Sequence, residues 1–247
     1  MVAQTTNGMN CQNCHLYGGI LTFGNNFGKV SSTYPQFRAR CNGMQNIYDR
    51  VNDCFERSLN GGKMDTNSRE VQAIYAYLKW VGDDVLNGTS KAGTGIMKLK
   101  YLKRAASPVA GGGIYIAKCQ SCHGVKGEGK LNIDVTGYTY PPLWGEHSYN
   151  DCAGLYRISS FAGFVKTNMP FGIDYHNPQL TDDEASDVGA FVNNQSRHHK
   201  DQMQDWKNFA QKPIDFPKGP YVDSFSEQQH KFGPFGTIKI DSAPSFP

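Results

Sequence analysis

The chain of 247 residues carries a formal net charge of +3 at pH 7, and 38% of its residues are hydrophobic. So slight a charge indicates neither nucleic acid nor an anionic membrane surface as a partner. No apolar run approaches the roughly 18 residues that span a bilayer. The first ten residues, MVAQTTNGMN, lack the basic and apolar regions of a secretion signal, so we expect any such signal to be missing from this chain.

The first motif along the chain is C-x-x-C-H at 11–15, and the same motif returns at 119–123. In c-type haem attachment both thiols bond to the haem and the adjacent histidine ligates the iron. A zinc site would need the two cysteine pairs to converge, and a thioredoxin-like motif has no use for the histidine. We therefore predict two covalently bound haem c groups. The haem-binding residues are then Cys11, Cys14, His15, Cys119, Cys122 and His123.

Covalent haem also indicates a compartment. Attachment of this kind takes place outside the cytoplasm, where disulfides persist too. We expect a periplasmic, exported protein.

Each haem motif is followed by the same order of elements. A helical pattern at 47–61 precedes a capped amphipathic helix that begins at 67, and a second pattern at 154–172 precedes a helix capped by Thr181 and Glu184. This is the plan of a class I cytochrome c domain, used twice, so the fold class is mainly α. The predicted units are a first domain at 1–82, a linker at 83–107, a second domain at 108–199 and a tail at 200–247.

The segments that join and follow the domains have a different composition. The linker is polar and rich in glycine, and it ends at Ser107 and Pro108, which suit the cap and first residue of a helix. The tail is rich in proline, glycine and aromatic residues. We expect it to lie along the body of the protein as extended chain and turns, because its aromatic residues argue against free disorder.

The second axial ligand of each iron decides what each haem can do. For haem two the sequence NMPFG offers Met169, in the loop where small cytochromes c present their methionine; Lys166 and His147 are the alternatives. A haem held by His123 and Met169 has no open position and a raised potential, so it passes electrons without binding substrate.

For haem one the spacing leaves two candidates, Cys54 and Met64, and register alone slightly favours Met64. On a helical wheel, however, one arc gathers Arg50, Cys54, Arg57 and Ser58, beside a core-facing stripe of Ile47, Tyr48, Val51, Phe55 and Leu59. Guanidinium groups one turn away favour the thiolate form of a cysteine, which is the form that binds metal and attacks sulfur. The residues around Cys54 therefore favour it as the ligand, whereas the spacing slightly favours Met64.

The sequences CFERSLNG, FRAR, YLKW, NMPFG and the tail PIDFPKGPY...FSEQQHKFGPF together resemble the dihaem thiosulfate dehydrogenases, which join two thiosulfates into tetrathionate. The similarity covers nearly the whole chain. It implies that Cys54 is the axial ligand of the active-site haem in the first domain, in place of Met64. It also implies a substrate cavity with Arg40, Arg50 and Ser58, whose types suit a dianion.

The resemblance also implies a mechanism. Cys54 takes up the sulfane sulfur of one thiosulfate, and a second thiosulfate releases tetrathionate from it, with the reverse reaction open in principle. Electrons pass to the haem of the second domain and then to an external acceptor such as another cytochrome c. Some members carry a lysine before the haem-two methionine, where this chain has Asn168.

Other interpretations stay open at this point. Cys41 and Cys152 are left over, and sequence cannot decide whether they form a disulfide. One rival function is a dihaem electron carrier with Met64 on the iron and no sulfur chemistry. A dihaem peroxidase is another, for which His198 and His199 would have to approach a haem rather than end a helix in solvent.

Overall fold

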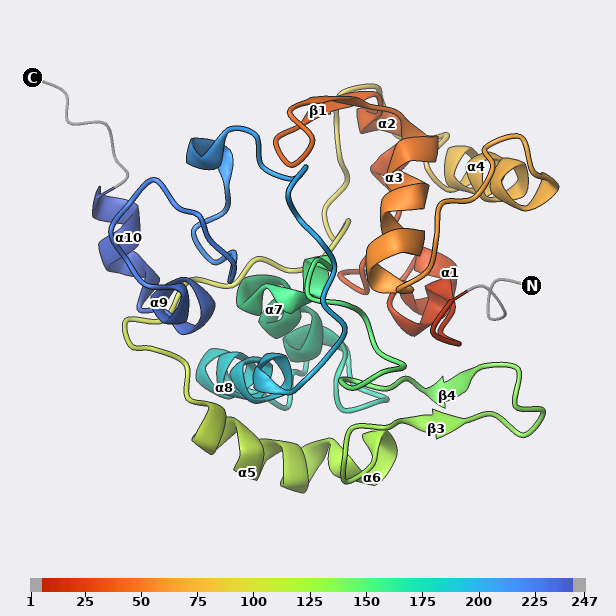
Figure 1. Cartoon of the computed structure of the whole chain (residues 1–247). Helices are drawn as coiled ribbons and strands as arrows, with labels where there is room; N and C mark the ends of the chain where they lie inside the picture. The colour runs from red at the N-terminus through yellow and green to blue at the C-terminus, as the bar shows by residue number, and fades with distance from the viewer. Residues whose placement is uncertain (1–5, 242–247) are drawn as a thin grey trace, which may run out of the picture.

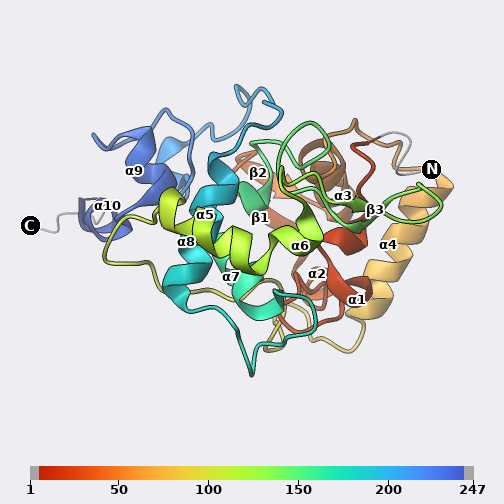
Figure 2. The same cartoon turned by 90° about the horizontal axis from the view of Figure 1, so that it is seen from below.

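A computed structural model describes residues 6–241, with side chains described through Ile238. The ends of the predicted first domain and tail, residues 1–5 and 242–247, lie outside the described residues. The chain forms two helical domains that lie side by side, and the tail packs on the second (Figure 1). Figure 2 shows the same division from below, with α1 to α4 on one side and α9 and α10 on the other.

Domain one is built around α3 and the segment that continues it. Its elements are a 3₁₀ turn (Cys11–Asn13), α1 (Leu16–Gly19), α2 (Val30–Thr33), β1 (Gln36–Arg38), β2 (Gly43–Gln45), α3 (Ile47–Asp53), a π-helical turn (Cys54–Ser58) and α4 (Arg69–Val81). A capping box between Asn46 and Asp49 begins α3, and Ser68 caps α4. The α-helix predicted over 47–61 therefore ends at Asp53, and the π-helical turn replaces its last part. The wider hydrogen bond of this turn runs from Leu59 N to Cys54 O at 3.0 Å.

Domain two follows the predicted pattern closely. Its elements are α5 (Pro108–Lys118), α6 (Gln120–His123), β3 (Lys130–Leu131), β4 (Tyr138–Tyr140), a 3₁₀ turn (Gly154–Tyr156), α7 (Ile158–Asn168) and α8 (Asp182–Asn194). Ser107 caps α5 with Pro108 in its first turn, and Thr181 and Glu184 form the capping box of α8, so both predicted helix starts are confirmed. At Gly111 a Cβ would come within 1.9 Å of Asp187 O, which explains how α5 and α8 pack so closely.

The tail corrects one prediction. Extended chain and turns were expected over 200–247, but the tail also contains a 3₁₀ turn (Phe209–Gln211) and two helices, α9 (Glu227–Phe232) and α10 (Phe235–Asp241). Ser226 caps α9. Phe235 and Ile238 are buried in a cluster with Ala106, Ile158 and Ala190 of the linker and domain two. Packing against the body therefore stabilises helices that are too short to form alone.

The two domains share a core. The hydrophobic cluster beneath α3 and α4 includes Tyr149, Ala153 and Tyr156 of domain two. The linker packs directly on α7 of domain two, because a Cβ at Gly163 would come within 1.9 Å of Met97 O. Both haem motifs thus belong to one packed body. In the part of the chain that the structure describes, none of the helices is both long enough and apolar enough for a membrane span.

Candidate active site

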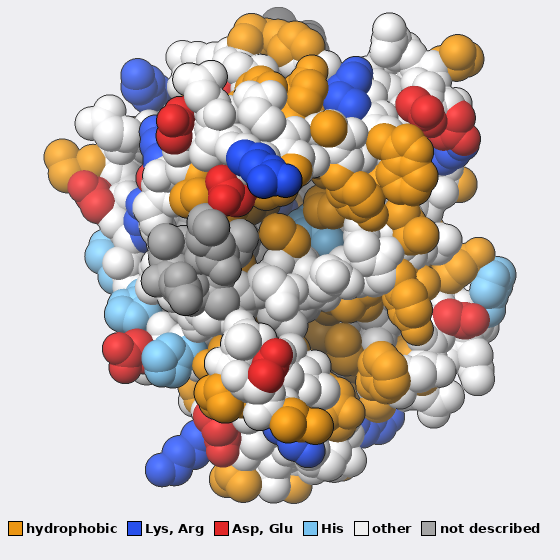
Figure 3. Space-filling model, turned by 90° about the vertical axis from the view of Figure 1, so that its right-hand side faces the viewer, with side chains coloured by type: hydrophobic (Ala, Val, Ile, Leu, Met, Phe, Trp, Pro, Cys, Tyr) orange, Lys and Arg blue, Asp and Glu red, His pale blue; other side chains and the backbone are white. Residues whose placement is uncertain are grey.

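A cavity of about 480 Å³ is lined by the first C-x-x-C-H motif and α3, and Ile96 of the linker and Leu155 of domain two also line it. Its volume falls within the about 300–1,000 Å³ typical of small-molecule and cofactor sites. Its lining combines apolar side chains with several cations and the Cys54 sulfur. Its lining includes Cys11, Cys14, His15, Phe27, Lys29, Val30, Tyr34, Gln36, Arg38, Arg50, Cys54, Ser58, Leu59, Ile74 and Leu78. Figure 3 shows hydrophobic side chains gathered around hollows on this side of the molecule.

The imidazole of His15 is held by a backbone carbonyl and an aromatic ring. Its Nδ1 lies 2.6 Å from Asn25 O, and its ring stacks on Phe27 with the ring centroids 4.0 Å apart. With the proton on Nδ1, Nε2 is the accepting nitrogen; it lies 3.3 Å from Asn25 Nδ2 and is the atom that would ligate a metal. Burial lowers the pKa of His15 to about 4, so the imidazole is neutral. The residues present therefore fit a covalently held haem.

Cys54 lies where α3 passes into the π-helical turn. Of the three polar neighbours predicted for it, Arg50 and Ser58 line the cavity, whereas Arg57 does not. Arg50 Nη1 donates to Cys54 Sγ at 3.1 Å, one helical turn away. The electrostatic interaction with Cys54 raises the pKa of Arg50. A π turn is often found at functional sites, because it aims side chains that a regular helix would turn away.

Met64, the alternative ligand, is placed differently. Its backbone is bound in both directions by the Asn52 side chain: Met64 N donates to Oδ1 at 2.8 Å, and Nδ2 donates to Met64 O at 3.1 Å. Met64 packs on the domain-one core and is not among the residues that line the cavity. The geometry therefore favours Cys54 over Met64 as the sulfur ligand.

Arg40 is not brought to the cavity wall. Its Nη1 donates to Cys152 O at 2.9 Å and to Asp205 Oδ2 at 3.1 Å, and its guanidinium lies 5.2 Å from the centroid of the Trp206 ring. Burial and the neighbouring Arg57 lower the pKa of Arg40. The carboxylate of Asp205 in the tail opposes this lowering of the pKa. The same carboxylate also pairs with Arg57 at 2.9 Å, so it lies between the two guanidinium groups.

Replacing Asp205 by asparagine is expected to destabilise the fold by about 3 kcal/mol, because two largely buried guanidinium groups would lose their shared carboxylate. The measurement is the thermal unfolding midpoint of the holoprotein. Asp183→Asn is the matched control, since Asp183 pairs with Arg104 in solvent, where an ion pair contributes about 0–1 kcal/mol. Equal midpoints for the two variants would show that Asp205 does not anchor the tail.

The second haem motif shows the same histidine arrangement. His123 Nδ1 lies 2.8 Å from Pro141 O, and burial lowers the pKa of His123. Met169 packs on the same hydrophobic cluster as Cys119. Asn168 is buried, and its Nδ2 donates to Phe164 O at 2.8 Å and to Phe23 O of domain one at 3.2 Å. Met169 and the second haem motif therefore lie in the same packed domain.

The remaining candidates lie away from the cavity. Cys41 and Cys152 are free thiols in the structure, and their sulfurs lie against backbone carbonyls. His199 is 68% exposed and pairs with Asp151 at 2.7 Å, which gives no support to a peroxidase. Among the described residues, no three His, Cys, Asp or Glu side chains come together as a metal-binding group.

The cavity residues that sequence reasoning missed include Tyr34, Gln36 and Arg38. Gln36 and Arg38 share one face of β1, whose middle residue, Phe37, is 50% exposed. Had a strand been predicted here, its period of two would have placed Gln36 and Arg38 on the same side.

Comparisons with known proteins agree with this architecture. The family model "SoxA/TsdA, cytochrome c domain" matches residues 2–85, and the "Cytochrome c" model matches residues 109–196. The chain is 36% identical over 205 residues to a thiosulfate dehydrogenase of Psychrobacter arcticus, covering 82% of this chain and 61% of that protein. It is 40% identical over 190 residues to one of Allochromatium vinosum, covering 75% and 68%.

A solved structure shows the same likeness. Thiosulfate dehydrogenase (TsdBA) from Marichromatium purpuratum, in its "as isolated" form, matches with a TM-score of 0.72 and 29% identity, covering 77% of this chain and 41% of that one. The chain thus spans about three fifths to two thirds of the length of the first two relatives.

Two cytochrome c domains with one attachment motif each make this chain a dihaem c-type cytochrome with two covalently bound haem c groups. Within that class, the chain belongs to the thiosulfate dehydrogenase family. The predicted fold class and cofactors are confirmed.

Proposed function

We propose that this chain oxidises two thiosulfates to tetrathionate, or catalyses the reverse reaction, with Cys54 as its reaction centre. The observation that carries the proposal is the 3.1 Å contact between Arg50 Nη1 and Cys54 Sγ, in a cavity that also contains the first haem motif. Electron transfer alone needs no thiol beside an arginine. His15 and Cys54 would hold haem one, and His123 and Met169 would hold haem two.

When bound, the two haems accept the electrons of the reaction and pass them out of the protein. The chain's own residues handle the sulfur. Arg50 holds a sulfonate beside Cys54 by charge-assisted hydrogen bonds, and Ser58 offers a further hydroxyl donor. The Cys54 thiolate bonds to the sulfane sulfur of thiosulfate with the loss of two electrons. A second thiosulfate then attacks that sulfane sulfur, so tetrathionate forms and the Cys54 thiolate leaves unchanged.

The acceptor and the compartment are part of the proposal. An external acceptor such as another cytochrome c takes the electrons from the haem of domain two. Covalent haem supports a periplasmic location. The test of the function is reduction of ferricyanide by the purified holoprotein with thiosulfate as the only donor. Turnover supports the enzyme, and its absence leaves an electron carrier.

Replacing Arg50 by alanine is expected to lower kcat/KM for thiosulfate by roughly 10- to 150-fold, which corresponds to about 1.5–3 kcal/mol for a lost hydrogen bond to a charged group. Arg50→Lys should recover only part, because an ammonium cannot form the paired contact of a guanidinium. Lys63→Ala is the control, since Lys63 is exposed and outside the cavity lining. The role of Arg50 is wrong if its variant and the control behave alike.

A further inference from the structure

We propose that Arg38, with Gln36 and Tyr34, forms a second sulfonate-binding subsite in the Cys54 cavity. This inference rests on the proposed function and extends it to the second anion. Tetrathionate carries a sulfonate at each end, and its formation brings two thiosulfate dianions together. One guanidinium, that of Arg50, lies at Cys54. A second cation is needed where the other sulfonate lies, because two dianions repel each other in a site shielded from water.

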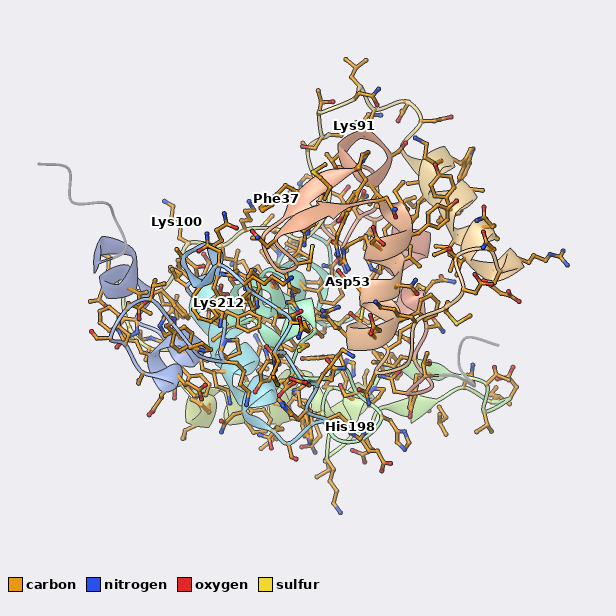
Figure 4. The ribbon with its side chains drawn as sticks, turned by 45° about the horizontal axis from the view of Figure 1, so that its top comes forward. Phe37, Asp53, Lys91, Lys100, His198 and Lys212 are labelled. Atoms are coloured by element: carbon orange, nitrogen blue, oxygen red, sulfur yellow. The ribbon has the colours of Figure 1, made fainter. Side chains whose placement is uncertain are left out.

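The hairpin of β1 and β2 places Arg38 on the cavity side. Gln36 pairs with Gln45, Phe37 with Met44 and Arg38 with Gly43 in the antiparallel register. Phe37 and Met44 are exposed, so their side chains occupy the outer face. Figure 4 labels Phe37 on this hairpin and Asp53 at the end of α3. The alternation of a strand then directs Gln36 and Arg38 inward, and both line the cavity.

Of the four arginines around the site, two are paired with carboxylates and two are not. Arg57 forms ion pairs with Asp53 and Asp205, and Arg40 shares Asp205. Arg38 and Arg50 take part in none of the ion pairs found among residues 6–238, whose side chains the structure describes. The two guanidinium groups without a carboxylate are therefore the two that line the cavity. Such an arrangement retains positive charge for an anion from outside.

Tyr34 connects the two cations. It lines the cavity together with Arg38, Gln36 and Arg50. Burial raises the pKa of Tyr34, and the nearby guanidinium groups of Arg50 and Arg38 oppose that rise, so both cations lie close to the phenol. A sulfonate at Arg38 can also accept from the Tyr34 hydroxyl or the Gln36 amide, which orients it relative to the sulfane sulfur at Cys54.

The test uses holoprotein with Cys54→Ala, which cannot turn over, so that binding is measured alone. Equilibrium dialysis with labelled tetrathionate compares this variant with the double variant that also carries Arg38→Ala. We expect binding to weaken by about tenfold or more, the loss of one charged hydrogen bond. Arg38→Lys should lie between the two. Lys63→Ala in the same background should bind as the parent does, because Lys63 is exposed and outside the cavity lining.

The outcomes separate this subsite from the proposed function. If the wild type oxidises thiosulfate but Arg38→Ala leaves tetrathionate binding unchanged, the subsite is wrong and the function stands. Failure of the Cys54→Ala protein to bind any tetrathionate, together with no turnover in the wild type, overturns both. A changed reduction potential of haem one in Arg38→Ala, with unchanged tetrathionate binding, assigns Arg38 to the haem and also overturns the subsite.

Discussion

Replacing Cys54 by alanine is expected to lower thiosulfate oxidation by at least about a hundredfold, because the sulfur that bonds to the substrate is removed. Haem attachment should survive, since it depends only on the cysteines of the two C-x-x-C-H motifs. Activity is measured as ferricyanide reduction, and haem content as the absorbance of the reduced, purified protein. Loss of activity with both haems attached is the result that the proposed function requires.

Two features of the structure make this variant informative. Cys54 is only partly buried, and alanine is a good helix former, so the substitution should leave α3 in place. Cys41→Ala supplies the matched control, because Cys41 is another partly buried free thiol of domain one outside the cavity lining. Full activity in the Cys54 variant, or equal losses in both, would remove Cys54 as the reaction centre.

The parts of the site that the sequence predicted are those set by local spacing. A C-x-x-C-H motif places both thiols and the histidine within one turn, and His15 N indeed donates to Cys11 O at 2.8 Å. One helical turn separates Arg50 from Cys54, so their contact also follows from sequence. Caps such as Thr181 with Glu184 are equally local. Each of these depends on at most five neighbouring residues.

What the sequence could not predict depends on distant contacts. Arg38 and Arg40 stand in one basic segment, FRAR, and contacts of Arg40 with Cys152 of domain two and with Asp205 of the tail distinguish them. The tail helices show the same limit. α9 and α10 are too short to form alone, and the burial of Phe235 and Ile238 against domain two stabilises them.

Replacing Met169 by glycine is expected to disturb only haem two, since Met169 packs in domain two near Cys119 and away from the Cys54 cavity. A methionine ligand raises the reduction potential, whereas an anionic thiolate stabilises ferric iron, so haem two should be reduced first. Stepwise titration with a mild reductant, followed by absorbance, should show two separate steps in the wild type. Met169→Gly should alter only the early step and remove the sulfur-to-iron charge-transfer band.

Two further variants make this prediction specific. Cys54→Ala should alter only the late step and remove the thiolate-type EPR signal of haem one. Met64→Leu, a swap of similar volume, should alter neither step, because Met64 lies outside the cavity and Asn52 holds its backbone. Two haems that titrate together, with a response to Met64 and none to Cys54, would falsify the thiolate ligand. The chain would then be better described as an electron carrier, because both irons would have the same histidine and methionine ligands.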